Sequence, residues 1–302
     1  MNRETALIAN STLNVRDQFP GIAGWHYLDS AATAQKPQAV IDAITTAYAR
    51  DYATVHRGIY QRSSEMTGRY EAARAAASKL IGGKPSELVF TRGATESINL
   101  VARALPKEGR TRVLLSQLEH HSNIVPWQLA GYEVDAAPLT GDGKIDLDAA
   151  EAMLTEDHRV VAFAHVSNVL GSVLDAKRAA EIAHAKGALL LLDGCQAVPR
   201  MPVDVAAIGC DFYAYSAHKL YGPEDSAGIV SFNVDGVHAH DTATILDDAG
   251  VAVRAGHHCA QPLMESLGVA ATARASFAAH SDSSDIEALV RGIEQVKRIF
   301  AK

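Results

Sequence analysis

Polar side chains follow several short apolar runs of this sequence, and two of them could act together in catalysis. Asp193 ends the run at residues 188–192, and Lys219 comes shortly after the run at 212–215. A carboxylate that ends a buried strand must be paired, bound to a metal or functional, because burying it alone is costly. Most lysines lie on the surface, but one beside a buried aspartate at the strand ends is suited to form a Schiff base.

Small residues after the run at 88–90 provide a third element of the same chemistry. Gly93 and Ala94 lie there and lead into a helical pattern. Small residues that open a helix leave backbone N–H groups free to bind a phosphate, although such a turn on its own is more often only a loop. Pyridoxal phosphate needs a lysine, a carboxylate for its ring nitrogen and a phosphate cradle together. The sequence therefore predicts a pyridoxal-phosphate site.

Histidines and cysteines are the other candidates for chemistry. His120 and His121 follow an apolar run, where a histidine is more often structural than functional. The sequence His257–Cys259 could ligate zinc, but no second Cys/His pair stands nearby at ligand spacing, so we expect no metal. Cys195 and Cys210 lie in or beside apolar runs, and we expect both to be inert core thiols. Three scattered cysteines indicate a reducing environment rather than a disulfide framework.

Alternating strand and helix patterns must position these residues. The apolar runs are brief and do not alternate with polar residues, as expected of strands buried on both faces of a parallel sheet. They lie at residues 88–90, 113–115, 160–163 and 188–192, and helical patterns lie at 37–48, 70–81, 97–105 and 175–186. In such α/β sheets, ligands bind at the carboxyl ends of the strands, where the candidate residues fall.

The last part of the chain has a different pattern. Residues 228–234 and 250–253 are typical of strands, and 284–300 of an amphipathic helix. We expect a small α+β domain there, beside an α/β domain with a mostly parallel sheet. A length of 302 residues allows one large or two modest domains.

Charge and hydropathy exclude several classes of function. The net charge of −7 gives no basic footprint for nucleic acid. No apolar stretch reaches the roughly 20 residues that span a bilayer, so we expect no membrane association. The N-terminus lacks the continuous apolar region of a secretory signal, and we expect a cytoplasmic protein.

Long stretches of the sequence resemble class V aminotransferase-fold enzymes, in particular the group II cysteine desulfurases of the Suf iron–sulfur assembly type, a group that includes selenocysteine lyases. The stretches are 27–33, 92–99, 119–127, 165–171, 193–197, 217–219 and, similar to the family's catalytic-cysteine loop, 254–264. The resemblance implies the type I fold of PLP transferases, like that of aspartate aminotransferase, in a homodimer. It places a large PLP-binding domain at residues 20–223. Residues 1–19 and 224–302 would form the small domain.

The resemblance also implies a role for each candidate residue. Lys219 would hold the cofactor and move the substrate proton. Cys259 would take the sulfur of L-cysteine as a persulfide and release L-alanine, and the sulfur would pass to an acceptor protein. In a selenocysteine lyase acting on L-selenocysteine, Cys259 need not act in the same way. His257, His258 and Arg254 would favour the thiolate of Cys259. Thr95, Ser216 and His218 would bind the cofactor phosphate. His120 would stack on the ring, Asp193 would pair with the ring nitrogen, and Gln196 would pair with the ring hydroxyl. The substrate-binding residues would be Asn168, Arg254 and Arg274.

The sequence departs from the family after Pro223. The family continues there with a glycine-rich strand, further helices and a threonine-containing loop that reaches the partner's cofactor phosphate, whereas here residues 224–227 lead directly into the C-terminal pattern. About a hundred residues are absent relative to the family. We expect the large sheet to lose at least one edge strand and to leave apolar surface uncovered. A non-catalytic remnant that acts as an interaction module, and a selenocysteine lyase or another class V reaction, remain as alternatives to a desulfurase.

Overall fold

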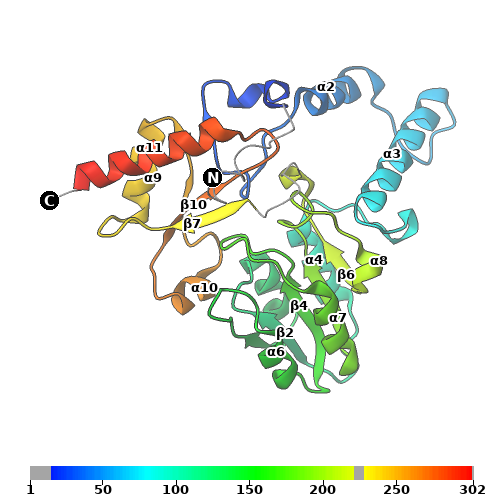
Figure 1. Cartoon of the computed structure of the whole chain (residues 1–302). Helices are drawn as coiled ribbons and strands as arrows, with labels where there is room; N and C mark the ends of the chain where they lie inside the picture. Colours follow the sequence, from blue (N-terminus) through cyan, green and yellow to red (C-terminus); the bar gives the residue numbers. More distant parts are fainter. Residues whose placement is uncertain (1–14, 221–227, 301–302) are drawn as a thin grey trace.

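A parallel sheet forms the centre of the computed structural model, which describes residues 15–220 and 228–300 (Figure 1). Within these residues the sheet has five strands in the order β3–β2–β4–β5–β6, each parallel to its neighbours. The strands are β3 (Glu133–Ala137), β2 (Arg112–Ser116), β4 (His158–Ala164), β5 (Leu189–Asp193) and β6 (Phe212–Ala214). The α/β architecture with a mostly parallel sheet is as predicted.

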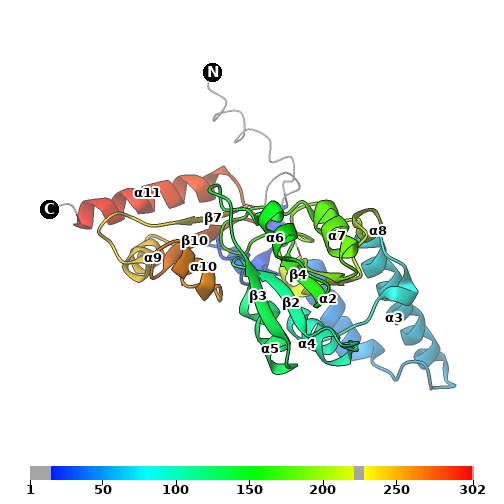
Figure 2. The same ribbon diagram turned by 90° about the horizontal axis from the view of Figure 1, so that it is seen from below.

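Helices cover both faces of this sheet, which is why its central strands are mainly apolar. Figure 2 shows α6 (Leu147–Met153) and α7 (Ala176–Ala185) on one side, and α4 (Ala94–Ala104) and α5 (Val125–Leu129) on the other. Successive side chains of a strand point to opposite faces. In β5, Leu190 and Leu192 therefore pack on the α7 side and Leu191 on the α4 side.

A smaller antiparallel sheet lies beside the parallel one and is the α+β unit expected of the C-terminal part. Its strand order is β7 (Ile229–Phe232), β10 (Thr272–Ser276) and β9 (Arg254–Gly256). The helices α9 (Ala239–Asp248) and α11 (Ser283–Phe300) pack against it. The strand β1 (His26–Tyr27) pairs with β8 (Val251–Ala252), so residues near the start of the chain join its C-terminal part. The domain boundaries themselves stay a prediction.

Shorter or peripheral helical segments complete the described chain. They are η1 (Arg16–Gln18), η2 (Pro20–Ile22), α2 (Gln38–Thr46), η3 (Ala47–Asp51), α3 (Gln61–Leu80), η4 (Pro85–Glu87), η5 (His121–Asn123), α8 (Val205–Ile208), η6 (Ala217–Lys219) and α10 (Gln261–Ser266). Across the described ranges, no helix is long and apolar enough to cross a membrane.

The stretch at residues 88–90 is not a strand, and the prediction of a strand there is wrong. It pairs with no other strand of the described chain, and Val89 and Phe90 are 69% and 44% exposed. A strand forms only where a neighbour satisfies its backbone groups. On this side the sheet ends at β6, which pairs only with β5 among the described residues. Within residues 15–220 and 228–300, the sheet therefore ends in a free edge with uncovered apolar side chains, as the break after Pro223 predicts.

A second uncovered apolar surface lies on α2, at the periphery of Figure 1. The predicted helix after Pro37 is present, but Ile41, Ile44 and Tyr48 are all exposed. An amphipathic helix normally buries such a face against its own protein or a partner.

Candidate active site

Every site residue that the sequence predicts lines one cavity of about 270 Å³. The cavity lies at the carboxyl ends of the parallel strands, and residues of the small antiparallel sheet close it. The predicted residues in its lining are Thr95, His120, Asn168, Asp193, Gln196, Ser216, His218, Lys219, Arg254, Cys259 and Arg274. Chain segments far apart in the sequence thus converge on a single site.

Lys219 reaches this cavity from a short turn that follows β6. The turn, η6, is one 3₁₀ turn in which the Lys219 N–H donates to the carbonyl of Ser216 at 3.1 Å. The preceding residue, His218, is exposed, and its Nδ1 lies 3.1 Å from Thr33 Oγ1. The turn therefore places a cationic side chain beside the part of the cavity where a phosphate could bind.

Ser216 links β6 to the start of α4, where an anion could bind. Its Oγ accepts the N–H of Ala94, the first residue of α4, at 2.9 Å. Gly93 before the helix has φ 144°, and a Cβ there would approach Ser216 Oγ to 3.2 Å. Thr95 lies exposed at the same helix end. Hydroxyl groups and free N–H groups at the N-terminus of an eleven-residue helix are a donor set that fits a phosphate.

Asp193 and His120 form the part of the cavity that would face an aromatic ring. Asp193 ends β5 and is buried, and its Oδ1 accepts the N–H of Cys195 at 3.0 Å. Burial, together with the nearby charge of Lys219, lowers the pKa of His120 to about 4. The Ser122 N–H donates to His120 Nδ1 at 3.1 Å, so this nitrogen carries no proton. His120 is therefore a neutral ring, suited to stacking, next to a carboxylate.

Gln196 is held at both ends of its side chain. Its Nε2 donates to the carbonyl of Ala31 at 2.9 Å, and its Oε1 accepts from Arg200 Nη1 at 2.6 Å. Arg200 is buried, and this burial lowers its pKa to about 10. The sequence analysis missed Arg200, because a single arginine outside any motif carries no signal of what it contacts.

Arg274 is anchored from two directions by residues that line or border the cavity. Its Nη1 donates to the carbonyl of Asn168 and its Nη2 to Asp29 Oδ1, both at 3.0 Å. Its buried Nε has no hydrogen-bond partner among the described residues. Burial raises the pKa of Asp29, and Arg274 opposes that rise. Asp29 belongs to a stretch that the sequence analysis singled out, but its role as the counter-ion of Arg274 required the structure.

Cys259 lies between β9 and α10 in a strained loop. His258 and Cys259 have φ values of 53° and 58°, in the left-handed region that these residue types seldom adopt. The Cys259 carbonyl accepts the His121 N–H at 2.9 Å, and His258 Nε2 lies 3.0 Å from Thr272 Oγ1. These contacts hold the unusual backbone in place.

The prediction that the charge of His258 favours the Cys259 thiolate is wrong. Burial, with a further contribution from Arg274, lowers the pKa of His258 to about 3, so its ring is neutral near pH 7. The cationic side chains that line the cavity are instead Arg254, Arg274 and Lys219.

Glu119 is a buried carboxyl group directly before His120, and the sequence analysis gave it no role. Its Oε1 accepts from Ser116 Oγ at 2.6 Å and from the Ala164 N–H at 2.9 Å, and its Oε2 accepts from Asn123 Nδ2 at 2.7 Å. Burial raises the pKa of Glu119 to about 7. Through these hydrogen bonds, Glu119 connects the ends of β2 and β4 to the turn after His120. A carboxyl group three residues after a buried strand was the signal available in the sequence.

The other two cysteines are half-buried, and Cys195 lines the cavity. Burial raises the pKa of Cys195, with Asp193 adding to the rise, and burial raises that of Cys210 to about 11. Both thiols therefore stay protonated near pH 7 and are poor nucleophiles. In the parts of the chain that the structure describes, no three His, Cys, Asp or Glu side chains are grouped so as to hold a metal ion.

Known proteins resemble this chain over nearly its whole length. The model of the class-V aminotransferase family matches residues 26–224 and 224–289. A probable cysteine desulfurase of Halalkalibacterium halodurans is 36% identical over 380 aligned positions, which cover 91% of this chain and 93% of the relative. A cysteine desulfurase of Klebsiella pneumoniae is 34% identical, with 91% and 94% covered. The crystal structure of the cysteine desulfurase CsdA from Escherichia coli has a TM-score of 0.86 at 30% identity and covers 97% of this chain and 99% of its own.

The same alignments show that this chain lacks a segment which its relatives carry. The 380 aligned positions exceed the 302 residues of the chain. The two matches of the family model meet at residue 224. The missing segment therefore belongs directly after Pro223, at a point outside the described residues, in agreement with the sequence prediction.

Proposed function

Since the chain belongs to the class-V aminotransferase family, we propose that it is a cysteine desulfurase that uses pyridoxal phosphate to convert L-cysteine to L-alanine. One observation carries this proposal: Lys219, from the turn after β6, and Cys259, from the loop between β9 and α10, line the same cavity. The lysine serves pyridoxal-phosphate enzymes in general, whereas a thiol placed to receive sulfur is the group that a desulfurase needs in addition.

The described residues fit the phosphate, the ring and its nitrogen, and the attachment point of the cofactor. Pyridoxal phosphate, when bound, supplies a ring that accepts electrons from the substrate. The start of α4 with Thr95, Ser216 and His218 would bind the phosphate, and Asp193 would keep the ring nitrogen protonated. The neutral ring of His120 would stack on the cofactor, and Lys219 would hold it and then move a proton at the α-carbon of the substrate.

The substrate side of the cavity is cationic. Arg274 would bind the carboxylate of L-cysteine, because its planar guanidinium matches a carboxylate and its Nε has no other partner in the described chain. Asn168 orients Arg274 through its carbonyl, and its own Nδ2 donates to the carbonyl of His258 at 2.8 Å. Arg254 adds a second positive charge.

Cys259 would receive the sulfur atom. The Cβ–S bond of L-cysteine breaks as an S–S bond to Cys259 forms, so Cys259 becomes a persulfide. The β-carbon gains the two electrons that the sulfur loses, together with a proton, and leaves as part of L-alanine without an external oxidant or reductant. We propose that the persulfide passes its sulfur to an acceptor protein for iron–sulfur cluster assembly. We also propose a cytoplasmic homodimer, since the uncovered apolar side chains of α2 are of the kind that an interface buries.

Cofactor binding is the first test. Pyridoxal phosphate added to the purified chain should give the visible absorbance band of lysine-bound cofactor. Borohydride reduction followed by mass spectrometry should locate the cofactor on Lys219. A Lys219→Arg variant should give neither signal, whereas Lys177→Arg, at an exposed position on α7, should give both. Labelling of another lysine would overturn the assignment.

Sulfur transfer is the second test. The chain should release L-alanine from L-cysteine, and Cys259→Ala should abolish this release while leaving the absorbance band intact. Cys210→Ala is the matched control and should retain the activity. L-alanine formed at an undiminished rate by Cys259→Ala would refute the role of this thiol.

A further inference from the structure

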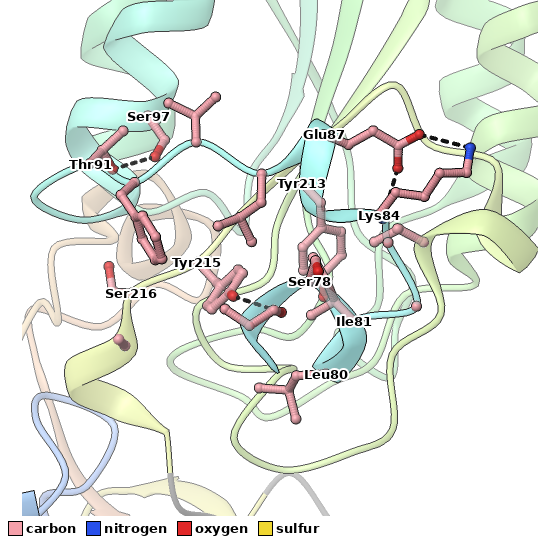
Figure 3. A pocket seen from close by; sticks show the side chains of 18 of the residues that line it. Ser78, Leu80, Ile81, Lys84, Glu87, Thr91, Ser97, Tyr213, Tyr215 and Ser216 are labelled. Atoms are coloured by element: carbon pink, nitrogen blue, oxygen red, sulfur yellow. Dashed lines mark hydrogen bonds and ion pairs between the residues drawn. The ribbon is translucent and has the colours of Figure 1, made fainter. Parts of the chain in front are cut away.

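A large groove opens at the free edge of the parallel sheet, beside the candidate active site (Figure 3). Its volume is about 940 Å³. The stretch from Glu87 to Thr91 forms one wall, and Tyr213 and Tyr215 of the chain at β6 form another. The groove also meets the active-site cavity, because Ser216 lines both.

The groove has the chemistry of a place for a β-strand. Val89, Phe90 and Leu80 present exposed apolar side chains to it. Among the described residues, β6 pairs with β5 alone, so the outer edge of β6 has no strand beside it. A strand inserted here would pair with β6 and cover the apolar side chains at residues 88–90. Such strand addition is a common way for a sheet edge to bind an extended peptide.

We propose that this groove binds one extended apolar polypeptide strand supplied in trans, equivalent to the segment that the relatives carry after the position of Pro223. The insertion point supports this occupant. Leu220 lines the groove, and the two matches of the family model meet four residues later, at residue 224. The insertion point therefore lies only four residues along the chain from a residue of the groove. The inference concerns polypeptide binding and does not depend on catalysis.

A second copy of the chain is a poor occupant. The free edge at β6 is only Phe212–Ala214, and Tyr213 of this strand forms a wall of the groove. Two copies that present the same concave edge cannot fill each other's groove. Of the longer segment that the relatives carry, only the strand that would pair with β6 is needed in the groove, and a strand in globular proteins spans about 5–6 residues.

A labelled peptide tests the proposal directly. The probe is a fluorescein-labelled peptide of about ten residues, enough for one strand with its ends, taken from the Halalkalibacterium halodurans relative just after its residue that aligns with Pro223. Fluorescence anisotropy should show saturable binding with one peptide per chain. Hydrogen exchange of the β6 amides should slow when the peptide binds.

Two matched controls separate strand addition from unspecific adhesion. The same peptide with alternate backbone nitrogens methylated keeps its side chains but loses N–H donors, and it should bind about tenfold more weakly, because main-chain hydrogen bonds carry the affinity. A Val89→Lys variant should also bind about tenfold more weakly, since a charge in an apolar groove loses hydration. Val290→Lys, at a valine on α11 that is 49% exposed, should bind as the unmodified chain does.

Three results would overturn the proposal. The first is no saturable binding up to roughly 100 μM peptide. The second is equal binding of the methylated peptide. The third is self-association of the chain that Val89→Lys abolishes, without peptide binding, which would make the groove an interface between copies.

Discussion

Replacing Glu119 with glutamine should change how the stability of the protein depends on pH. Burial raises the pKa of Glu119 from its ordinary 4.5 to about 7. Between these values the folded chain keeps a proton that the unfolded chain has lost. The stabilising contribution of this group is therefore complete below pH 4.5 and is lost as the pH rises through about 7.

The size of this effect follows from the shift. A difference of about 2.5 pH units corresponds to about 3 kcal/mol of unfolding free energy, at about 1.4 kcal/mol per unit. Three buried histidines act in the opposite direction, because burial lowers the pKa of His120 and His165 to about 4 and of His258 to about 3. Their contribution is present above pH 6.5 and is lost on acidification. Glu119→Gln leaves them unchanged, so the difference between the two proteins isolates Glu119.

Urea unfolding at pH 5 and pH 7.5 measures this difference. Glu119→Gln lowers stability at both pH values, since its amide nitrogen would face the donor Nδ2 of Asn123, which now donates to Oε2 at 2.7 Å. The loss should be about 2 kcal/mol smaller at pH 7.5 than at pH 5, because only the native glutamate must release its proton and this pH range covers only part of its titration. Glu294→Gln, on the exposed face of α11, should show the same loss at both values. An equal loss for Glu119→Gln at pH 5 and pH 7.5 would refute the argument.

Three further substitutions or treatments test other parts of the structure. Asp29→Asn keeps a hydrogen-bond acceptor for Arg274 but removes the competing negative charge, so the KM for L-cysteine should fall about fivefold; a raised KM in steady-state assays would contradict this. Burial raises the pKa of Cys195, so iodoacetamide at neutral pH should leave this thiol unmodified in the native protein and modify it in urea. Mass spectrometry measures the extent of labelling. Equal labelling of the native and the unfolded protein would show an accessible, reactive thiol. Gly292→Ala would place a Cβ 2.4 Å from Leu246 Cδ2. The overpacking should lower the free energy of unfolding by about 1–3 kcal/mol, which exceeds the gain in helix propensity from alanine. A raised melting temperature would disprove this.

The residues of the cavity could be predicted because most of them follow apolar runs that fold as parallel strands. Asp193 ends β5, and Ser216 and Lys219 follow β6. The carboxyl ends of parallel strands lie along one edge of a sheet. Residues that follow these strands therefore lie close together, independently of the conformation of the connecting loops. Cys259 and Arg274 come from the small sheet instead, and only the family resemblance associated them with the others.

Contacts that depend on distant partners were beyond the sequence pattern. The run at residues 88–90 has the composition of a buried strand, but a strand also needs a neighbour, and the nearest edge of the sheet leaves it unpaired. Arg200 and Glu119 carry buried polar groups whose partners come from separate loops and strands. Hydrogen bonds of this kind follow from the tertiary fold, which hydrophobic periodicity does not specify.

The order of the strands accounts for a site that stays assembled next to an incomplete sheet edge. β2, β4 and β5 each have a strand on both sides, and β6 is paired with β5. The segment that the relatives carry is inserted at residue 224, after the last strand of the parallel sheet. Its absence therefore removes no contact between the strands that deliver His120, Asn168 and Asp193. The loss falls on the outer edge of β6, where the groove lies, and a strand bound there would complete the sheet without moving the catalytic residues.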